Sequence, residues 1–543
     1  MPPGDTPAAA TGANNRADRL NTRAAGVVGL AVLCSRVLGL AREQIFAALF
    51  GGGRVMDAFT IAFRIPNLLR DLFAEGALST AFVTVFTRTA AVEDAAAAWR
   101  LANKVATLAA VTLSAITVLG ILSAPWLVAA LAPGFDADKA QLTVTLTRVM
   151  YPFILLVSLA ALVMGMLNAR NVFGVPAMAS SFFNLGSIIA GVVLGYWLDP
   201  HFGPHAILGL AIGTLVGGAL QLCVQLPALA REGYRFRADF AWRDPGVKAL
   251  LRLMGPSVIA ASTTQVNVLI NSVFASELGD GPTFWLTVAF RLMQLPLGIF
   301  GVALGTVALP LLARMAATGN VAVFRSELAR GMRLAFLMTI PASVGLMVLA
   351  EPIISVLYQH GRFGAYETAE SAGALRFYAI GLCGYAALKV LVNAFYAIDR
   401  RKTPMVVSFL AVALNLALNF LFTRELGFGH RGLALSTACV ATSNFLILYF
   451  LMRSHLGRLE SRAMLTLLSK LALASLVLLG LAWTGGHYLL AHWATQAFGP
   501  KCLSLMLVIA VSGAGFFLCA HALGIAEVDD ILSAVRRRLG RRG

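Results

Sequence analysis

Long runs of apolar residues recur along the chain, each about the length of a membrane helix. A hydrocarbon core about 30 Å thick needs about 20 mostly apolar helical residues. Fourteen segments meet this requirement: 25–49, 57–87, 105–131, 142–168, 174–197, 206–230, 250–277, 283–313, 331–357, 370–397, 404–423, 432–452, 465–488 and 502–523. A membrane barrel would show short alternating segments rather than runs such as LALASLVLLGLAW. The pattern predicts an all-α polytopic membrane protein with 14 transmembrane helices.

The composition agrees with this pattern. Of 543 residues, 58% are hydrophobic and 13% are charged, whereas soluble domains average about 25% charged residues. Residues 1–24 are basic, rich in Pro, Ala and Gly and without apolar periodicity, so we predict a disordered tail. The first apolar run is too long for a signal-peptide core, contains Arg36 and lacks a small-residue cleavage site. It is therefore predicted to be a retained first span.

The basic residues indicate the topology. With a cytoplasmic N-terminus, most of the 43 Lys and Arg residues fall in cytoplasmic segments. The opposite loops hold six: Arg54, Lys139, Arg362, Arg424, Arg431 and Lys501. Both termini are therefore predicted to be cytoplasmic. The net charge of +17 is mainly a topology signal facing anionic lipid, not a nucleic-acid footprint.

Eight basic residues fall inside the predicted spans. Each costs about 2.5–3.5 kcal/mol at mid-membrane, so these side chains should face protein or a water-filled cavity. Arg148, Arg376 and Lys389 could equally lie near an interface or pair with a neighbouring helix. The other five are Arg36, Arg42, Arg64, Arg70 and Arg291. Four of these five belong to the first two predicted spans.

The chain contains an internal repeat at one of these charged stretches. An offset of 227 residues aligns AFTIAFRIPNLLRDLFAEGALSTAFVTVF (58–86) with WLTVAFRLMQLPLGIFGVALGTVALPLLA (285–313) without a gap. Apolar helices resemble one another by chance, but the shared T-[IV]-A-F-R places Arg64 opposite Arg291. Copy one carries Arg70, Asp71 and Glu75 where copy two has apolar residues or glycine. Arg64 is therefore the shared charge, for which a helix-to-helix contact is an alternative, and Arg70 is specific to the first copy.

The repeat predicts two six-helix halves, at 25–245 and 246–455. Two extra helices would occupy 456–523, and a basic cytoplasmic tail 524–543. Repeated halves in a membrane protein are typical of a transporter that works by alternating access, with its substrate site between the halves. Pro66, Pro296 and Pro310 should kink their helices.

The chemistry inside the spans is cationic. Guanidinium groups bind phosphate in a bidentate way and stay charged when desolvated. A cavity lined by Arg36, Arg42, Arg70 and Arg291 would suit an anion, especially a phosphate or pyrophosphate. The acidic residues Glu43, Asp57, Asp71 and Glu75 could hold these arginines or form plain structural ion pairs.

Polar side chains on the seventh predicted span could line the same cavity: Gln265, Asn267 and Asn271. We expect Asn184 and Asn415 instead to join helices by hydrogen bonds. The chain lacks a G-x-x-x-x-G-K-[ST] loop, and the run Gly51-Gly52-Gly53 is predicted to be a flexible turn rather than a phosphate cradle. The six cysteines have no ligand-type spacing, so no metal site is predicted from them.

Residues 35–86 have the sequence SRVLGLAREQIFAALFGGGRVMDAFTIAFRIPNLLRDLFAEGALSTAFVTVF. In this stretch the chain resembles the MurJ-type (MviN) lipid II flippases of the multidrug/oligosaccharidyl-lipid/polysaccharide exporter superfamily. Three further pieces carry the resemblance: APWLVAALAPGF (124–135), RLMQLPLGIFGVALGTVALPLL (291–312) and FYAIDRRKTP (395–404). Together these pieces extend the resemblance over roughly residues 25–523.

The resemblance implies fourteen helices, with two pseudo-symmetric six-helix lobes around a central cavity and two extra C-terminal helices. It also implies a transporter rather than an enzyme, located in the bacterial inner membrane. It implies movement of lipid II, the undecaprenyl-pyrophosphate-linked peptidoglycan precursor, from the cytoplasmic to the periplasmic leaflet for cell-wall biosynthesis. Membrane lipids and cell-wall synthesis proteins are the other partners expected. The family's required arginines fall here on Arg36, Arg42, Arg70 and Arg291, and its acidic position on Asp57. Asn67 and Glu75 match the same motif.

Two points depart from the family pattern. Some relatives carry acidic residues around the arginine of span 8, whereas this chain has Phe290 and Gln294 near Arg291. Some relatives also bind a sodium ion among spans 7, 11 and their neighbours, but no acidic ligand set for sodium is evident here, so sodium coupling stays open. No other cofactor is expected.

Three other functions are weighed against flipping of lipid II. One is export of another polyprenyl-linked oligosaccharide or of a drug on the same fold; cationic drugs would need an acidic cavity rather than an arginine-rich one. Another is a membrane glycosyltransferase or phosphatase acting on the same lipid, for which catalytic motifs are missing. The last is a scaffold that binds cell-wall enzymes without transport.

Overall fold

The structure is a computed structural model, and it describes residues 8–73, 78–317, 320–490 and 497–529. Within these ranges the chain is helical and contains no strand. The helices form two compact units. Unit 1 contains Met1–Phe50, Ala58–Ala130 and Asp136–Gln265, and unit 2 contains Gly51–Asp57, Leu131–Phe135 and Val266–Gly543. The predicted lobe boundary at 245/246 stays a prediction.

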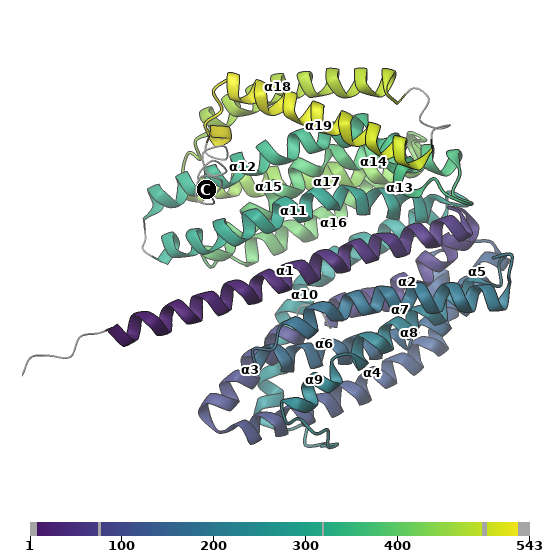
Figure 1. Cartoon of the computed structure of the whole chain (residues 1–543), viewed down its shortest axis with the longest axis vertical. Coiled ribbons are helices and arrows are strands. Elements are labelled where there is room, and N and C mark those ends of the chain that lie inside the picture. Colours follow the sequence, from purple (N-terminus) through teal and green to yellow (C-terminus); the bar gives the residue numbers. More distant parts are fainter. Residues whose placement is uncertain (1–7, 74–77, 318–319, 491–496, 530–543) are drawn as a thin grey trace, which may run out of the picture. The chain divides into compact units, whose positions relative to one another are not determined.

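The helices of unit 1 are numbered in chain order (Figure 1). They are α1 (Ala8–Phe50), α2 (Arg54–Phe73), α3 (Ser79–Val92), α4 (Ala95–Leu131), α5 (Ala137–Met150), α6 (Phe153–Ala169), α7 (Gly174–Leu198), α8 (Ile207–Cys223), α9 (Leu226–Arg231) and the first part of α10 (Pro245–Ser276). The first turn of α2 belongs to unit 2, because the division falls after Asp57. The helix α2 is thus shared by both units.

The remaining helices belong to unit 2 (Figure 1). They are α11 (Pro282–Ala317), α12 (Val321–Val348), α13 (Ala350–Tyr358), α14 (Ala365–Ile380), α15 (Leu382–Ala397), α16 (Lys402–Phe420), the π-helix η2 (Leu421–Glu425), α17 (Gly429–Leu456), α18 (Ser461–Tyr488) and α19 (Phe498–Ala522). The last two helices run alongside each other. Their exposed faces carry large apolar side chains such as Leu476 and Leu503, as expected of a surface that contacts lipid.

The prediction of an all-helical polytopic membrane protein is confirmed. Among the described residues, nine helices are long and apolar enough to cross a membrane, or ten if the bent pair α14–α15 is one span. The other four predicted spans lie in α1, α2 with α3, α10 and α11. The count of 14 therefore stays a prediction. Residues 74–77, inside the predicted span 57–87, lie outside the described residues.

One boundary differs from its prediction. The helix α1 begins at Ala8, inside the stretch 1–24 that we predicted to be a disordered tail. Residues 8–24 are rich in alanine, which has the highest helix propensity of all residues. Lack of an apolar stripe argued against burial of this segment, but it does not prevent helix formation.

Small residues bring the helices of unit 1 together. The helices α7 and α8 lie side by side, and a side chain at Gly209 or Gly213 would collide with the backbone of Gly195 or Gly191. The two facing glycines on each helix are four residues apart, so they form one small-residue face. Such faces let the backbones of membrane helices approach closely. The glycines of this region therefore have a packing role.

Candidate substrate site

The acidic residue Asp57 lies in the first turn of α2 and is fully buried. Its carboxylate accepts hydrogen bonds from two backbone N–H groups, Gly281 N to Oδ2 at 2.6 Å and Phe284 N to Oδ1 at 2.9 Å. Both donors belong to the N-terminal end of α11, where the helix dipole favours negative charge. Phe284 N also donates to the Gly281 carbonyl at 3.0 Å, so it shares its proton between two acceptors. Asp57 is thus the cap of α11 in this structure, an interaction that its sequence position did not reveal.

This contact joins equivalent positions of the internal repeat. The offset of 227 residues places Phe284 opposite Asp57, and the hydrogen bond between them spans the same 227 residues. The first turns of α2 and α11 therefore meet at equivalent positions of the repeat, and both turns belong to unit 2.

The turn before α2 packs against the same end of unit 2. Gly51 and Gly52 are buried, and a side chain at Gly52 would meet Glu367 and Phe363 within 3.0 Å. Gly51 also has a φ of +77°, a conformation that glycine adopts without strain. Gly51 and Gly52 are thus packed against the start of α14, and the flexibility of the turn stays a prediction.

The repeated helices bury their residues in the same pattern. From Asp57/Phe284 to Leu69/Pro296, every pair of equivalent residues is either buried in both copies or accessible in both. The accessible positions at spacings of three and four include Thr60, Arg64 and Asn67 on α2 and Thr287, Arg291 and Gln294 on α11. Such spacing puts residues on one helix face. Arg64 and Arg291 therefore lie on equivalent, incompletely covered faces of their helices.

The first copy differs from the second at Arg70. This side chain is half-buried and donates to Asp71 Oδ1 through Nη2 at 2.9 Å and Nε at 3.2 Å. The second oxygen of Asp71 accepts from Gln265 of α10 at 3.2 Å and from Asn67 at 3.5 Å. Three predicted site residues, Asn67, Arg70 and Gln265, are thus brought together around one carboxylate. At the equivalent positions α11 has the buried Leu297 and then Gly298.

Two aromatic rings lie close to Arg42 of α1. Its guanidinium carbon lies 4.9 Å from the ring centroid of Phe183 on α7 and 5.9 Å from that of Phe63 on α2. Both phenylalanines also contact Phe153 of α6, at 5.5 Å and 5.4 Å between centroids. Such cation–π contacts position a guanidinium that remains charged. Sequence reasoning found Arg42 but not the phenylalanines that hold it.

The other predicted residues are distributed as follows. Arg36 lies on an exposed face of α1, one residue after Ser35, whose carbonyl oxygen accepts from Asn184 of α7 at 3.1 Å. Asn184 therefore joins two helices, as predicted. Arg291 belongs to unit 2, whereas Arg36, Arg42, Arg64 and Arg70 belong to unit 1. Glu75 lies outside the described residues.

Asn271 of α10 belongs to a network of amides and hydroxyls in unit 2. Asn419 of α16 donates to Asn271 at 2.8 Å and to Asn415 at 3.3 Å, and Asn271 donates to Thr437 of α17 at 3.1 Å. Ser436 completes the network by donating to Asn419. One turn before Asn271, the buried side-chain oxygen of Asn267 accepts no hydrogen bond from the residues that the structure describes. The network joins α10, α16 and α17, so its asparagines connect helices.

These residues do not fit a resident sodium ion well. The amide oxygens of Asn271, Asn415 and Asn419 already accept hydrogen bonds, and the network includes no carboxylate. Among the described residues, no group of three or more His, Cys, Asp or Glu side chains could hold a metal ion.

Comparison with known proteins identifies the family. The family model "Lipid II flippase MurJ" matches residues 46–503. The lipid II flippase MurJ of Burkholderia cenocepacia is 37% identical over 83% of this chain and 89% of its own length. The probable lipid II flippase MurJ of Vibrio cholerae is 33% identical over 93% of this chain and 96% of its own length.

Solved structures agree on the fold. A lipid II flippase MurJ in an inward closed conformation superposes with a TM-score of 0.74 at 25% identity, over 90% of this chain and 98% of that one. An inward-facing multidrug resistance transporter of the MATE family gives 0.66 at 16% identity, over 79% of this chain and 96% of its own, and shows a shared fold only. With its sequence match extending over most of its length, the chain belongs to the MurJ family of lipid II flippases.

Proposed function

We propose that this protein flips lipid II across the bacterial inner membrane, from the cytoplasmic to the periplasmic leaflet, by alternating access. The observation that carries the proposal is the pair of repeated helices, each with an arginine on an incompletely covered face, within a chain of this family. We further propose 14 spans in two lobes, with both termini in the cytoplasm.

The arginines suit the pyrophosphate of the substrate. A pyrophosphate that leaves water for the membrane interior must exchange its hydration shell for hydrogen-bond donors, since an unpaired charge there is costly. Guanidinium groups provide several N–H donors each and stay charged when desolvated. We assign this role to Arg36, Arg42, Arg70 and Arg291, with Arg42 oriented by Phe63 and Phe183 and Arg70 by Asp71.

The helix α2 has the features of an element that moves. It passes from unit 2 to unit 1 after Asp57, and Pro66 interrupts its hydrogen-bond ladder nine residues later. We propose that Asp57 stabilises one state of the transport cycle by capping α11. Release of α11 from Asp57 would then accompany the change to the other state.

Depletion of the protein in its host tests the function. We expect lipid II to accumulate on the inner leaflet, measured by its accessibility to a reagent that acts from the periplasm. Flipping that continues at the normal rate after depletion would contradict the proposal. Replacing lipid II by another polyprenyl-linked sugar in the same assay distinguishes the alternative exporter, which would accept both.

Arg42→Ala and Arg291→Ala test the site. We expect both variants to reach the membrane in normal amounts and to fail to complement the depleted strain. Arg453→Gln, which removes an exposed cation at the end of α17, is the charge-matched control and should complement. Full complementation by both alanine variants would exclude a role of the arginines in holding the pyrophosphate.

A further inference from the structure

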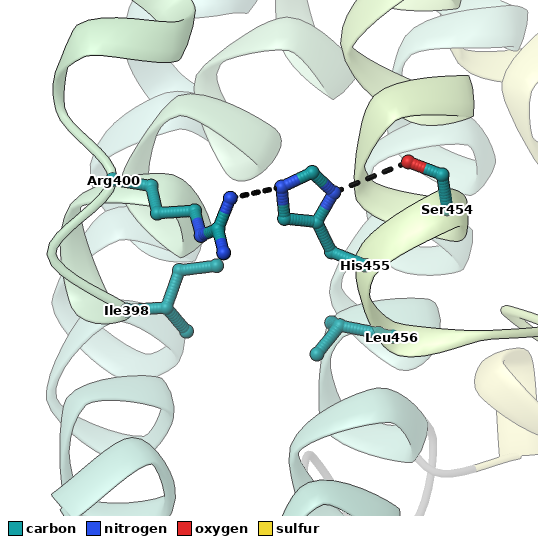
Figure 2. A pocket seen from close by; sticks show the side chains of 5 residues that line it. All are labelled: Ile398, Arg400, Ser454, His455 and Leu456. Atoms are coloured by element: carbon teal, nitrogen blue, oxygen red, sulfur yellow. Dashed lines mark hydrogen bonds between the residues drawn. The ribbon is translucent and has the colours of Figure 1, made fainter.

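A small cavity lies at one end of unit 2, between the connection from α15 to α16 and the last turn of α17 (Figure 2). Its volume is about 470 Å³, and it is lined by Ile398, Arg400, Ser454, His455 and Leu456. In the predicted topology this end of both helices is cytoplasmic, because Arg400, Arg401, Lys402 and Arg453 belong to the positive loops. None of the lining residues belongs to the proposed lipid II site.

Three polar side chains form a chain of hydrogen bonds in this cavity. The Arg400 guanidinium points at His455 and donates to its Nε2 (Figure 2). A guanidinium has only donors, so Nε2 must be the accepting nitrogen and the proton of the neutral ring lies on Nδ1. Nδ1 then donates to Ser454 Oγ at 3.1 Å, and Ser454 donates to the Leu451 carbonyl at 2.8 Å. The arrangement holds the guanidinium in place at the cost of one of its five donors.

The charge of Arg400 is not neutralised by an acidic side chain. Among the described residues, no carboxylate forms a salt bridge with it, and the neighbouring Asp399 pairs instead with Arg401 at 3.6 Å. Arg400 is also solvent-accessible. A fixed cation in a concave site, with donors left over, has the features that bind an oxyanion.

The walls of the cavity indicate what carries the anion. Ile398 and Leu456 are partly exposed aliphatic side chains that lie below Arg400 and His455 in Figure 2. A free phosphate ion gains nothing from them, whereas the glycerol and upper acyl carbons of a phospholipid would pack on them. Basic pockets between helices on the cytoplasmic side of a membrane protein suit anionic head groups.

We propose that this cavity binds the phosphate of an anionic phospholipid, with Arg400 as the main contact and His455 and Ser454 as positioning residues. The site lies in unit 2 and is independent of the proposed transport of lipid II. A lipid bound there would connect the loop after α15 to the end of α17.

Lipid binding by the purified full-length protein tests the proposal. Short-chain phosphatidylglycerol, short-chain phosphatidylcholine and inorganic phosphate are titrated separately, and the bound molecules are counted by native mass spectrometry. We expect phosphatidylglycerol to bind more tightly than either of the others. Arg400→Gln should weaken it about tenfold, the factor that loss of one hydrogen bond to a charged group removes.

Arg453→Gln is the matched control, because Arg453 has the same charge at the same end of α17 without lining the cavity. Binding should stay within about twofold of the wild type. Arg400→Lys keeps the charge but loses the planar fork, so it should lie between wild type and Arg400→Gln, and it provides a second variant should Arg400→Gln fail to fold. If inorganic phosphate binds as tightly as the lipid, the cavity is an anion site whose ligand is free phosphate, and the assignment to a phospholipid is wrong. Equal losses in Arg400→Gln and Arg453→Gln, or no loss in Arg400→Gln, would overturn the proposal.

Discussion

The helices α2 and α11 are two versions of one element, and among the described pairs their burial first differs at Arg70/Leu297. Over 13 consecutive pairs, from Asp57/Phe284 to Leu69/Pro296, they agree on which residues are covered by protein. At the next pair, α2 has the half-buried Arg70, paired with Asp71, and α11 has the buried Leu297. The 13 equivalent pairs therefore share one burial pattern and one arginine, Arg64 or Arg291. The first copy adds the charged pair Arg70 and Asp71.

This difference separates two kinds of charge. Arg64 and Arg291 occupy positions that the scaffold leaves accessible in both copies, so their environment follows from the repeat. Arg70 exists in one copy only and depends on local partners, Asp71, Asn67 and Gln265. A symmetric scaffold that binds an asymmetric lipid needs such a difference between its halves. We therefore expect the first copy to be the more sensitive to substitution.

The largest effect is expected for Asp57→Ala, which breaks the contact between the copies. It removes the side-chain acceptor of two buried backbone N–H groups. Phe284 N keeps a hydrogen bond to the Gly281 carbonyl at 3.0 Å, whereas the loss at Gly281 N costs about 1–3 kcal/mol. The midpoint of thermal unfolding of the purified protein should fall by several degrees. Asp280→Ala is the control, since Asp280 is exposed and pairs with Arg54 at 3.8 Å, so its loss should change the midpoint little. Equal midpoints for the two variants would contradict the capping role of Asp57.

Arg70→Ala should have the next largest effect, on transport. Removing a charge-assisted contact to the substrate costs about 1.5–3 kcal/mol, so the rate at low lipid II concentration should fall about 10- to 100-fold. The repeat-matched control is Leu297→Met, a volume-conserving change that should cost less than about 1.5 kcal/mol of stability and leave transport intact. If Arg70→Ala transported at the wild-type rate, the charged cluster would be structural only.

Gln265→Ala should have a smaller effect, because it removes one donor to Asp71 and leaves the contact of Asp71 with Arg70. A single hydrogen bond contributes about 0.5–1.5 kcal/mol, so transport should fall about two- to tenfold. A double-mutant cycle with Asn67→Ala, which removes the other amide donor, measures whether the two act through the same carboxylate. If the free-energy effects of the two substitutions add strictly, Gln265 and Asn67 do not act through the same carboxylate.

Phe183→Leu should have the smallest effect. It removes the nearer ring from Arg42 and keeps an apolar side chain in the core beside Phe153. A cation–π contact contributes about 0.5–1 kcal/mol, so the apparent affinity for lipid II should weaken about two- to fivefold with little change in maximal rate. A large fall in maximal rate with unchanged affinity would contradict the orienting role of the ring.

The sequence alone could indicate candidate site residues where placing their side chains in the membrane interior costs free energy. A charge inside an apolar run needs a reason, so Arg42, Arg70 and Arg291 could be singled out without a structure. The helices could be predicted for the same reason, since only long apolar runs satisfy the bilayer. Boundaries were less predictable: α1 begins at Ala8, because alanine favours helix even where no apolar face requires one.

The partners of these residues could not be predicted. Asp57 binds backbone N–H groups, which carry no side-chain signature in the sequence. Phe63 and Phe183 are two of 33 phenylalanines, and no spacing relates them to Arg42. Asn419 was not singled out, because an amide in an apolar run reveals its role only when the facing helices are known. Long-range contacts of this kind depend on tertiary packing.

Flipping of lipid II by the purified protein in vesicles tests the central claim most directly. The initial rate is compared between the wild type, Arg70→Ala and Arg291→Ala, with the amount and orientation of each protein in the vesicles matched. If arginines of both repeat copies bind the pyrophosphate, both variants should lose at least about tenfold in rate. Wild-type rates in both variants would contradict the claim.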